Sequence, residues 1–305
     1  MRTRRSRVQI PPGVLNFFAL FIFVTGKGGT GKSLLSVVLA NSLSRRGKTI
    51  LYFPSAFPSP LYEFVSKNVV LYPIDYEKEA KEYVKIKLKF FLFWFPFVRS
   101  SIFRVFSKVI PGFYELILLG KMWYDWYNNA ADFYVFDGLP IGQIVSLFRV
   151  PKAGVESGIG GPVKDDMMKM VDFTYKINLI ITTLPEILPY EETREFVEIL
   201  KNEGLKPRAI CLNKFYTRKL SDYERKWVEM ILIEGKLKKK ERKQLSQLLD
   251  FENFLYENSQ KFLRVYSELG FDVFTLDFSI RGIDHDFVRK QEEKILQSSI
   301  FSHLS

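Results

Sequence analysis

The sequence predicts an α/β fold in which a doubly wound, mostly parallel sheet carries helices on both faces. Apolar, β-branched runs that suit buried strands alternate with longer segments of helical period along most of the chain, and this alternation is typical of parallel βαβ units. The first apolar run, residues 20–24, passes through a glycine-rich turn into a helical pattern that starts at Lys32. This strand, loop and helix order is the context of a phosphate-binding loop.

The first thirteen residues carry four arginines followed by two prolines, which mimics the basic start of a signal peptide. No small-residue cleavage site follows the apolar run of residues 14–24, and this run is too short to span a bilayer. We therefore expect residues 14–24 to contribute the first strand. Residues 1–13 are predicted to be an extension outside the fold, and residues 14–305 a single domain.

The glycine-rich turn completes the pattern G-x-x-x-x-G-K-S between Gly26 and Ser33. Glycines let successive backbone N–H groups turn inward around an anion, and the following helix points its positive end at that anion. We expect Lys32 to reach the β and γ phosphates and Ser33 to ligate Mg²⁺. The candidate nucleotide-binding residues of this loop are Gly26, Lys27, Gly28, Gly29, Thr30, Gly31, Lys32, Ser33 and Leu34.

The later strands are predicted from short apolar runs, and the helices from longer segments of helical period. The expected strands are residues 48–53, a short run after residue 66, 132–137, 178–184, 207–212 and 273–278. The expected helices are residues 76–89, 111–126, 190–204, a helical hairpin within 220–269 and a terminal helix after residue 282. Closely spaced glycines predict a flexible loop over residues 152–169, with a brief helix over 165–170.

A second functional element is the buried run of residues 132–137, which ends in Asp137. In a parallel sheet, a carboxylate at the end of a strand lies at the edge where ligands bind. Asp137 is therefore predicted to be the Mg²⁺ partner of Ser33, through a water molecule. Pro140 and Gly142 are expected to form a loop whose shape changes with the γ-phosphate.

The phosphate loop contains an extra lysine, Lys27, directly after its first glycine. The resulting pattern, G-K-G-G-x-G-K-[ST], resembles the deviant Walker A loop of one class of P-loop ATPases. Further segments are similar to the arsenical pump-driving and tail-anchored-protein targeting ATPase family within that class, and the resemblance covers most of residues 20–290. These segments are 111–115, 137–143, the span from Pro185-Glu186 to Asn213-Lys214, and Arg281-Gly282.

The resemblance to this family implies a P-loop ATPase that uses ATP and Mg²⁺ and works as a homodimer. In that family the extra lysine reaches the partner's nucleotide, so the resemblance makes Lys27, Lys32 and Asp137 the catalytic candidates. It also implies that Asn213 contacts adenine, whose edge matches the donor and acceptor groups of an amide. A solvated loop lysine and a turn asparagine are the alternatives for Lys27 and Asn213. Nucleotide state would then reshape a partner or client surface through two switch segments.

Two positions depart from the family pattern. Ala56 aligns with the switch aspartate that would orient the attacking water, and Gln143 replaces a histidine of the second switch. The missing carboxylate leaves a second function open, a nucleotide-gated binding module with little or no hydrolysis. A degenerate relative that binds no nucleotide is a third reading, which the intact loop argues against.

The formal net charge of +11 favours an anionic partner such as a nucleotide, a membrane surface or a nucleic acid. No nucleic-acid motif is present. The single cysteine, Cys211, excludes a disulfide framework and the thiolate cluster that arsenite would need, and its apolar surroundings suit a buried strand residue. No metal other than the Mg²⁺ of the nucleotide is expected, because the two histidines lack ligand-like spacing.

Two insertions carry features of a docking surface. The aromatic-rich segment 85–110 contains nine consecutive apolar residues, 90–98, behind three lysines. It either packs into the core or presents a surface to lipid or to a hydrophobic client peptide. In the hairpin of residues 220–269, the basic run 236–243 suits a solvated turn. The more specific alternative is that this run binds anionic lipid or nucleic acid. We expect a cytoplasmic protein, peripheral at a membrane if one of these surfaces docks there.

Overall fold

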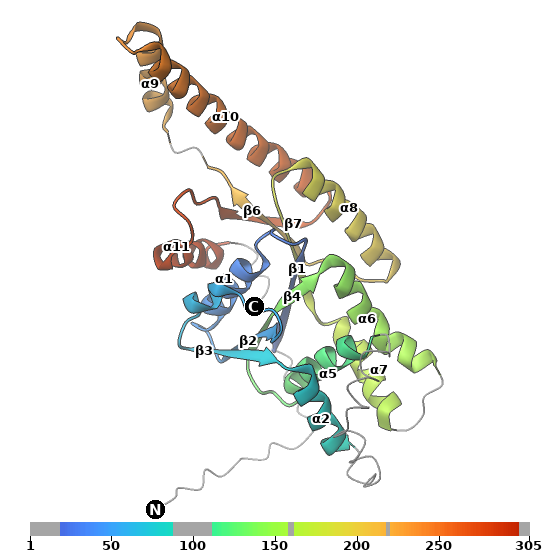
Figure 1. Ribbon diagram of the computed structural model, residues 1–305. Helices are drawn as coiled ribbons and strands as arrows, with labels where there is room; N and C mark the ends of the chain where they lie inside the picture. The colour runs from blue at the N-terminus through green and yellow to red at the C-terminus, as the bar shows by residue number, and fades with distance from the viewer. Residues whose placement is uncertain (1–18, 88–111, 158–161, 218–219, 299–305) are drawn as a thin grey trace, which may run out of the picture.

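The computed structural model of the 305-residue chain describes residues 19–87, 112–157, 162–217 and 220–298. At its centre is a seven-stranded sheet with the strand order β3-β2-β4-β1-β5-β6-β7. Every pair of neighbouring strands is parallel, and helices cover both faces (Figure 1). The fold class predicted from the sequence is therefore confirmed.

Strands and helices alternate along the chain. The strands are β1 (Leu20–Gly26), β2 (Thr49–Pro54), β3 (Val69–Ile74), β4 (Phe133–Pro140), β5 (Asn178–Thr183), β6 (Ala209–Phe215) and β7 (Asp272–Asp277). The first helices are α1 (Lys32–Leu43), the 3-10 helix η1 (Pro60–Phe64), α2 (Tyr76–Lys87), α5 (Phe113–Tyr127) and α6 (Ile141–Glu156). The later ones are α7 (Pro162–Thr174), α8 (Ile187–Asn202), α9 (Asp222–Glu234), α10 (Lys239–Glu268) and α11 (His285–Leu296).

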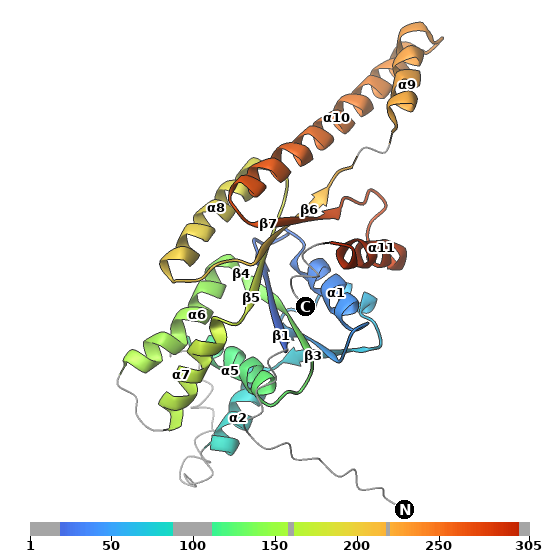
Figure 2. The same ribbon diagram turned by 180° about the vertical axis from the view of Figure 1, so that it is seen from behind.

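The sheet divides the core into two layers because side chains alternate between the faces of a strand. In β1, Phe21 and Phe23 lie in the cluster covered by α5, α6, α7 and α10. Ile22 and Val24 lie in the opposite cluster, which is covered by α1 and α11. Both faces of β1 are thus buried, as expected for the central strand of a doubly wound sheet (Figure 2).

Two expectations about the segment after β4 were wrong. Pro140 and Gly142 do not form a loop, because α6 begins at Ile141, and a glycine is tolerated in the first turn of a helix. The predicted loop over 152–169 is mostly the end of α6 and the start of α7. Gly154 is a packing residue: an added Cβ would lie 2.4 Å from the sulfur of Met167, so its small size lets the two helices approach.

The helical hairpin predicted within residues 220–269 is formed by α9 and α10. Both views show it projecting from the sheet domain (Figures 1 and 2), while Phe262 and Tyr266 near the C-terminal end of α10 are buried in the core. In the described part of the chain, no helix combines the length and the apolar character needed to cross a membrane. Residues 1–13 and most of the segment 85–110 lie outside the described residues.

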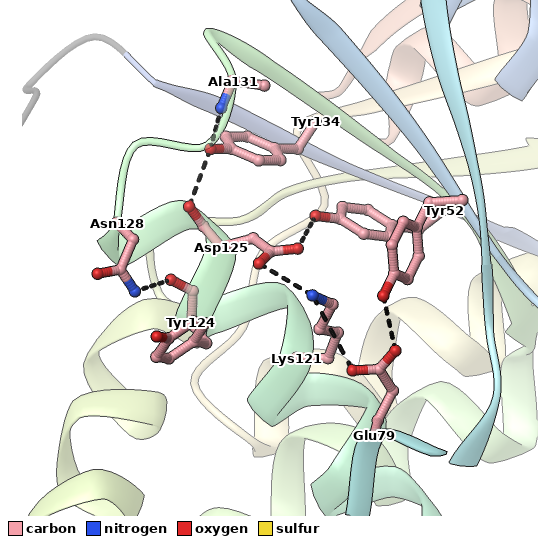
Figure 3. A network of polar contacts seen from close by, with 9 residues as sticks. Tyr52, Glu79, Lys121, Tyr124, Asp125, Asn128, Ala131 and Tyr134 are labelled. Carbon is pink, nitrogen blue, oxygen red and sulfur yellow. Dashed lines mark hydrogen bonds and ion pairs between the residues drawn. The ribbon is translucent and has the colours of Figure 1, made fainter. Parts of the chain in front are cut away.

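A network of buried polar side chains joins α2 and α5 to the edge of the sheet (Figure 3). The Lys121 ammonium lies 3.1 Å from Asp125 and 3.9 Å from Glu79. The Tyr52 hydroxyl donates to Asp125 at 2.6 Å, and the Tyr72 hydroxyl donates to Glu79 at 2.7 Å. One cation and two tyrosines thus satisfy two carboxylates that have little access to water.

Asp277, the last residue of β7, holds α11 against the sheet. Its carboxylate lies 2.6 Å from the Lys294 ammonium and 3.1 Å from that of Lys290. Burial alone would raise the pKa of Asp277, but the hydrogen bond and charge of Lys294, with the hydrogen bond of Lys290, outweigh it and lower the pKa. A carboxylate with a lowered folded-state pKa contributes stability above its unfolded pKa and loses it as the pH falls through the folded value.

Replacing Asp277 by asparagine is therefore expected to lower the free energy of unfolding at neutral pH by about 1–2 kcal/mol. The deficit should shrink as the pH falls below the ordinary aspartate range and vanish below the lowered pKa. Urea unfolding across this range measures it. The control is Asp286→Asn, since Asp286 is exposed on α11 and its loss should cost almost nothing. A deficit independent of pH would contradict the prediction.

Candidate functional site

The glycine-rich loop leaves β1 at the C-terminal edge of the sheet, between β4 and β5. Gly26 and Gly31 have φ angles of +152° and +97°, which side chains rarely adopt. A Cβ on Gly26 would lie 2.3 Å from the Thr182 carbonyl oxygen, and one on Gly31 would lie 2.0 Å from the amide nitrogen of Asn213. The loop therefore packs tightly against the ends of β5 and β6, and glycine is required at both positions.

The opposite side of the loop is open. Gly28 and Gly29 are exposed, and an added Cβ at either would meet no atom within 4 Å. Helix α1 starts directly after the loop with no capping side chain and no acidic residue in its first turn. A helix N-terminus of this kind attracts anions through its unpaired N–H groups and its dipole. The space and the charge of this cradle fit the phosphates of a nucleotide.

Lys32 lies inside the curve of the loop. Its ammonium donates to the carbonyl oxygens of Gly26 at 3.2 Å and Lys27 at 3.0 Å. Burial lowers the pKa of Lys32, and the charge of Asp137 opposes this effect. The cation is therefore partly desolvated and only partly neutralised, which favours contact with an added phosphate.

Ser33 and Asp137, the two predicted Mg²⁺ residues, come together beside Lys32. The register of the sheet pairs Asp137 of β4 with Val24 of β1, which brings its carboxylate to the start of α1. There the carboxylate accepts from the Ser36 hydroxyl at 3.3 Å, and the nearby Ser33 hydroxyl opposes the rise in its pKa that burial causes.

The electrostatic setting of this carboxylate suits a cation. Asp137 is only 6% exposed, and burial raises its pKa against the opposing hydrogen bonds and the Lys32 charge. Oxygen ligands from a hydroxyl and a carboxylate are those that Mg²⁺ prefers, with the remaining positions left to phosphate and water. Among the described residues, no group of three His, Cys, Asp or Glu side chains could hold a metal ion, so this pair is the better candidate.

Tyr62 was not predicted from the sequence. This residue lies in η1, in the segment that follows β2, and its hydroxyl donates to the Asp137 carboxylate at 2.6 Å. Ser33 also acts on this hydroxyl and opposes the rise in its pKa that burial causes. The tyrosine hydroxyl thus lies beside the same two groups that would hold Mg²⁺. This contact could not be predicted from the sequence, because nothing in residues 57–64 indicates that their tyrosine lies next to β4.

Replacing Tyr62 by phenylalanine is expected to tighten the binding of Mg·ATP by about tenfold, because a hydrogen bond to a charged carboxylate no longer competes with the metal. Affinity for ATP without Mg²⁺ should not change. Titration calorimetry with and without Mg²⁺ separates the two. Tyr175→Phe is the matched control, since Tyr175 is exposed and lies directly after the end of α7. An unchanged Mg²⁺ dependence would refute the role of Tyr62.

Lys27, the extra lysine of the loop, is half exposed and forms an ion pair with Glu192 of α8. The other carboxylate oxygen of Glu192 is buried without a hydrogen-bond partner among the described residues. Beside this pair is a cavity of about 300 Å³, lined also by Gly28, Pro140 and Glu195. The contact lies within one chain, and the role of Lys27 across a dimer interface remains a prediction.

Asn213 braces the loop. Its amide nitrogen donates to the Thr30 carbonyl oxygen at 2.8 Å, and its side chain is 4% exposed. The contact of Asn213 with adenine stays a prediction. Its hydrogen bond to the Thr30 carbonyl oxygen is a second contact, which was not predicted. Ala56 lies exposed in the turn after β2, and Cys211 is buried in β6, as its apolar surroundings predicted.

A parallel sheet with this loop at its C-terminal edge defines the class of P-loop nucleotide-binding proteins. The sequence model of the anion-transporting ATPase family matches residues 19–206, and the chain belongs to this family. The family resemblance predicted from the sequence is thereby confirmed, and with it a nucleotide-binding ATPase fold.

Two curated relatives mark out the degree of similarity. The putative arsenical pump-driving ATPase 2 of Aquifex aeolicus (strain VF5) is 24% identical over an alignment of 238 residues, and the match covers 63% of this chain and 79% of that protein. The ATPase BagA of Mycobacterium tuberculosis (strain ATCC 25618 / H37Rv) is 26% identical over an alignment of 216 residues, and the match covers 63% of this chain and 64% of that protein. The match thus spans slightly less than two thirds of the mycobacterial relative.

Proposed function

We propose that the chain binds ATP with Mg²⁺ and hydrolyses it to ADP and phosphate. The observation that carries the proposal is the position of the Asp137 carboxylate, which the register of β4 and β1 brings to the start of α1, where Ser33 and Lys32 both act on it. The loop N–H groups and Lys32 would hold the phosphates, and Ser33 and Asp137 would hold Mg²⁺, which supplies positive charge to the transferring phosphoryl group.

Lys32 is the main electrostatic contribution of the chain itself. Phosphoryl transfer spreads negative charge over the γ-phosphate oxygens, and a partly buried ammonium acts on that charge more strongly than a solvated one. The loop also holds its own shape through the Asn213 brace and the two constrained glycines. Little reorganisation would then be needed when ATP binds.

The first experiment measures ATP affinity by calorimetry and phosphate release in a single turnover, both with Mg²⁺ and with a chelator. The proposal requires Mg²⁺-dependent binding of ATP followed by release of phosphate faster than the uncatalysed background. Absence of ATP binding would refute it entirely.

A second candidate function is a nucleotide-gated binding module that scarcely hydrolyses ATP. Ala56 favours it, because an alanine cannot orient the attacking water as the aligned aspartate would. Tight Mg·ATP binding combined with phosphate release at the background rate would select this function. Arsenite is not proposed as a cargo, since the chain has one cysteine and it is buried.

We also propose that ATP promotes a homodimer in which Lys27 contacts the partner's nucleotide. Lys27 would first have to leave Glu192, and an ion pair this exposed costs at most about 1 kcal/mol to break. In the monomer, the ion pair would therefore hold Lys27 beside Glu192, but weakly enough for Lys27 to leave when the dimer forms. Support comes from the half-exposed position of Lys27 at the rim of the loop.

Replacing Glu192 by glutamine is expected to strengthen ATP-dependent dimerisation by up to about fivefold, since Lys27 is released. Lys27→Ala should weaken it. Sedimentation equilibrium with Mg·ATP measures both. Glu198→Gln is the control: Glu198 lies on the same helix but pairs with Lys201. Equal dimerisation by all three variants and the parent protein would contradict this arrangement.

Nucleotide binding would change a partner-binding surface through movements of α8 and α10. Thr193, next to Glu192, donates to Thr183 at the end of β5, and the Thr183 hydroxyl lies 2.8 Å from that of Tyr266 in α10. All three hydroxyl residues are buried. A shift of α8 on release of Lys27 would therefore be felt at the base of the α9–α10 hairpin. The partner is proposed to be a hydrophobic client peptide or a membrane surface.

A further inference from the structure

Helix α9 is amphipathic, yet none of its residues is buried. Four large side chains lie at positions i, i+4, i+7 and i+8, which places them along one face. These are Tyr223, Trp227, Met230 and Ile231, and all four are exposed, Tyr223 to 71% and Trp227 to 49%. We call these four residues the apolar stripe.

The stripe faces away from the rest of the hairpin. Arg225 of α9 contacts Glu252 and Asn253 of α10, so the side of α9 that carries Arg225 faces α10. Successive residues of a helix are rotated by about 100°, and the stripe is therefore centred on the opposite side. Within the described residues, no element packs over it.

A cluster of basic residues lies next to the end of the stripe. The turn between α9 and α10 and the first turn of α10 are rich in exposed basic side chains, accompanied by two acidic residues, Glu241 and the exposed Glu234 at the end of α9. Glu241 already accepts from the backbone of Lys238 in a helix cap, so its charge is partly engaged. The basic cluster consists of Lys236, Lys238, Lys239, Lys240, Arg242 and Lys243.

The position of the hairpin makes both features accessible together. Figures 1 and 2 show that its tip is the part of the described chain that reaches farthest from the sheet. Strand β1 and helix α1, which the nucleotide loop joins, lie in the sheet domain and away from the tip (Figures 1 and 2). A flat surface could therefore approach the tip without meeting the nucleotide site.

Charge and apolar character select one kind of partner. Basic residues beside an exposed aromatic and aliphatic face are the pattern of helices that bind the interface of anionic membranes. A nucleic acid would match the basic cluster but would leave Met230 and Ile231 in water. A second copy of the chain would match the apolar stripe but would bring like-charged clusters into the same region.

We propose that the tip of the α9–α10 hairpin docks on an anionic membrane surface, with the apolar stripe in the headgroup region and the basic cluster on the lipid phosphates. This deepens the proposed role in partner docking by naming the surface and its partner. It does not depend on hydrolysis, because the contact is made by residues remote from the loop.

The test is flotation of the full chain, without nucleotide, with vesicles of phosphatidylcholine alone or mixed with phosphatidylglycerol. Binding is expected only to the mixed vesicles. The double variant Lys239→Glu/Lys240→Glu should weaken it by roughly thirtyfold or more, because each basic residue near the surface contributes several-fold. The matched control, Lys67→Glu/Lys206→Glu, changes the net charge equally at exposed positions away from the hairpin and should bind as the parent does.

The stripe has its own readout. Met230→Ser is expected to weaken vesicle binding several-fold, whereas Met168→Ser, at an exposed methionine of α7, should not. Tryptophan emission should shift to the blue on vesicle binding, and Trp227→Phe should remove that shift while the protein still floats. These results together would establish the proposed orientation.

Other outcomes would overturn the proposal. They are equal binding to neutral vesicles, absence of vesicle binding, or a tip variant that binds as well as its control. Self-association lost in Met230→Ser would assign the stripe to a second copy, and binding of duplex DNA or RNA without vesicle binding would assign the cluster to nucleic acid. ATP affinity is measured on the same samples, so failure here is distinguishable from failure of the proposed nucleotide site.

Discussion

Replacing Lys32 by alanine is expected to lower phosphate release by about a hundredfold to a thousandfold, the cost of removing one preorganised positive donor from a developing oxyanion. ATP affinity should fall as well, because the same ammonium holds the ground-state phosphates. The expectation follows from the position of Lys32, whose ammonium lies over the Gly26 and Lys27 carbonyl oxygens inside the loop. Single-turnover assays and calorimetry on one preparation measure both losses.

The same variant should not lose stability. Burial lowers the pKa of Lys32, which means that the folded state disfavours its charged form relative to the unfolded state. Removing the ammonium therefore removes a cost, and the free energy of unfolding is expected to stay constant or rise. Lys67→Ala, at an exposed lysine, is the control for both measurements. Normal phosphate release, or a clear loss of stability, would show that Lys32 has a structural role instead.

The loop and its metal pair could be predicted because both depend on local sequence and on one topological rule. The glycines and Lys32 form a contiguous pattern, and strand ends in a parallel sheet meet at one edge. Asp137 and Ser33 are about a hundred residues apart in sequence, yet alternation of strands and helices sufficed to bring them together. The effect of Ser33 on the pKa of Asp137 is consistent with the prediction, and their role in metal binding stays a prediction.

Contacts made by side chains from irregular segments could not be predicted. Tyr62 reaches Asp137 because η1 folds back after β2, and that path is set by packing of the whole edge. Glu192 lies in a segment that resembles the family. Its ion pair with Lys27 depends on how closely α8 packs beside the loop, which the sequence does not indicate. A sequence pattern gives the residue types of such a site but not the distance between elements.

The error over residues 140–169 has a different cause. Glycine and proline are treated as signals of turns because of their local backbone preferences. In α6 those preferences are overridden by burial: Ile144, Leu147 and Phe148 are almost inaccessible to water. Gly154 is favoured by its close approach to Met167. Tertiary packing of an apolar face therefore decided the helix, as it does for most helices in proteins.

Replacing Lys121 by methionine is expected to lower the free energy of unfolding by about 3–5 kcal/mol, the cost of removing one partner from a buried ion pair. Methionine keeps much of the apolar stem, so the loss reports the ammonium and not the volume. The side chains of Lys121, Asp125 and Glu79 are 16%, 14% and 4% exposed, and both carboxylates face this one cation (Figure 3). Equilibrium unfolding in guanidinium chloride measures the change.

The pH dependence of this variant identifies the cause of its instability. Burial already raises the pKa of Glu79, against the hydrogen bond from Tyr72 and the charge of Lys121, so removing that charge should raise it further. A carboxyl group with a raised folded-state pKa stabilises the fold when it is protonated, and this stabilisation is lost as the pH rises. The deficit of Lys121→Met should therefore be largest at neutral pH and shrink as the pH is lowered.

Two further variants complete the comparison. Glu79→Gln in the Lys121→Met background should recover part of the lost stability, because the amide oxygen still accepts from Tyr72 without carrying a charge. Lys81→Met removes an exposed lysine from α2 that pairs with Glu77 and should cost less than about 1 kcal/mol. If Lys121→Met cost no more than Lys81→Met, the buried cation would not be what holds α2 and α5 against β2 and β3.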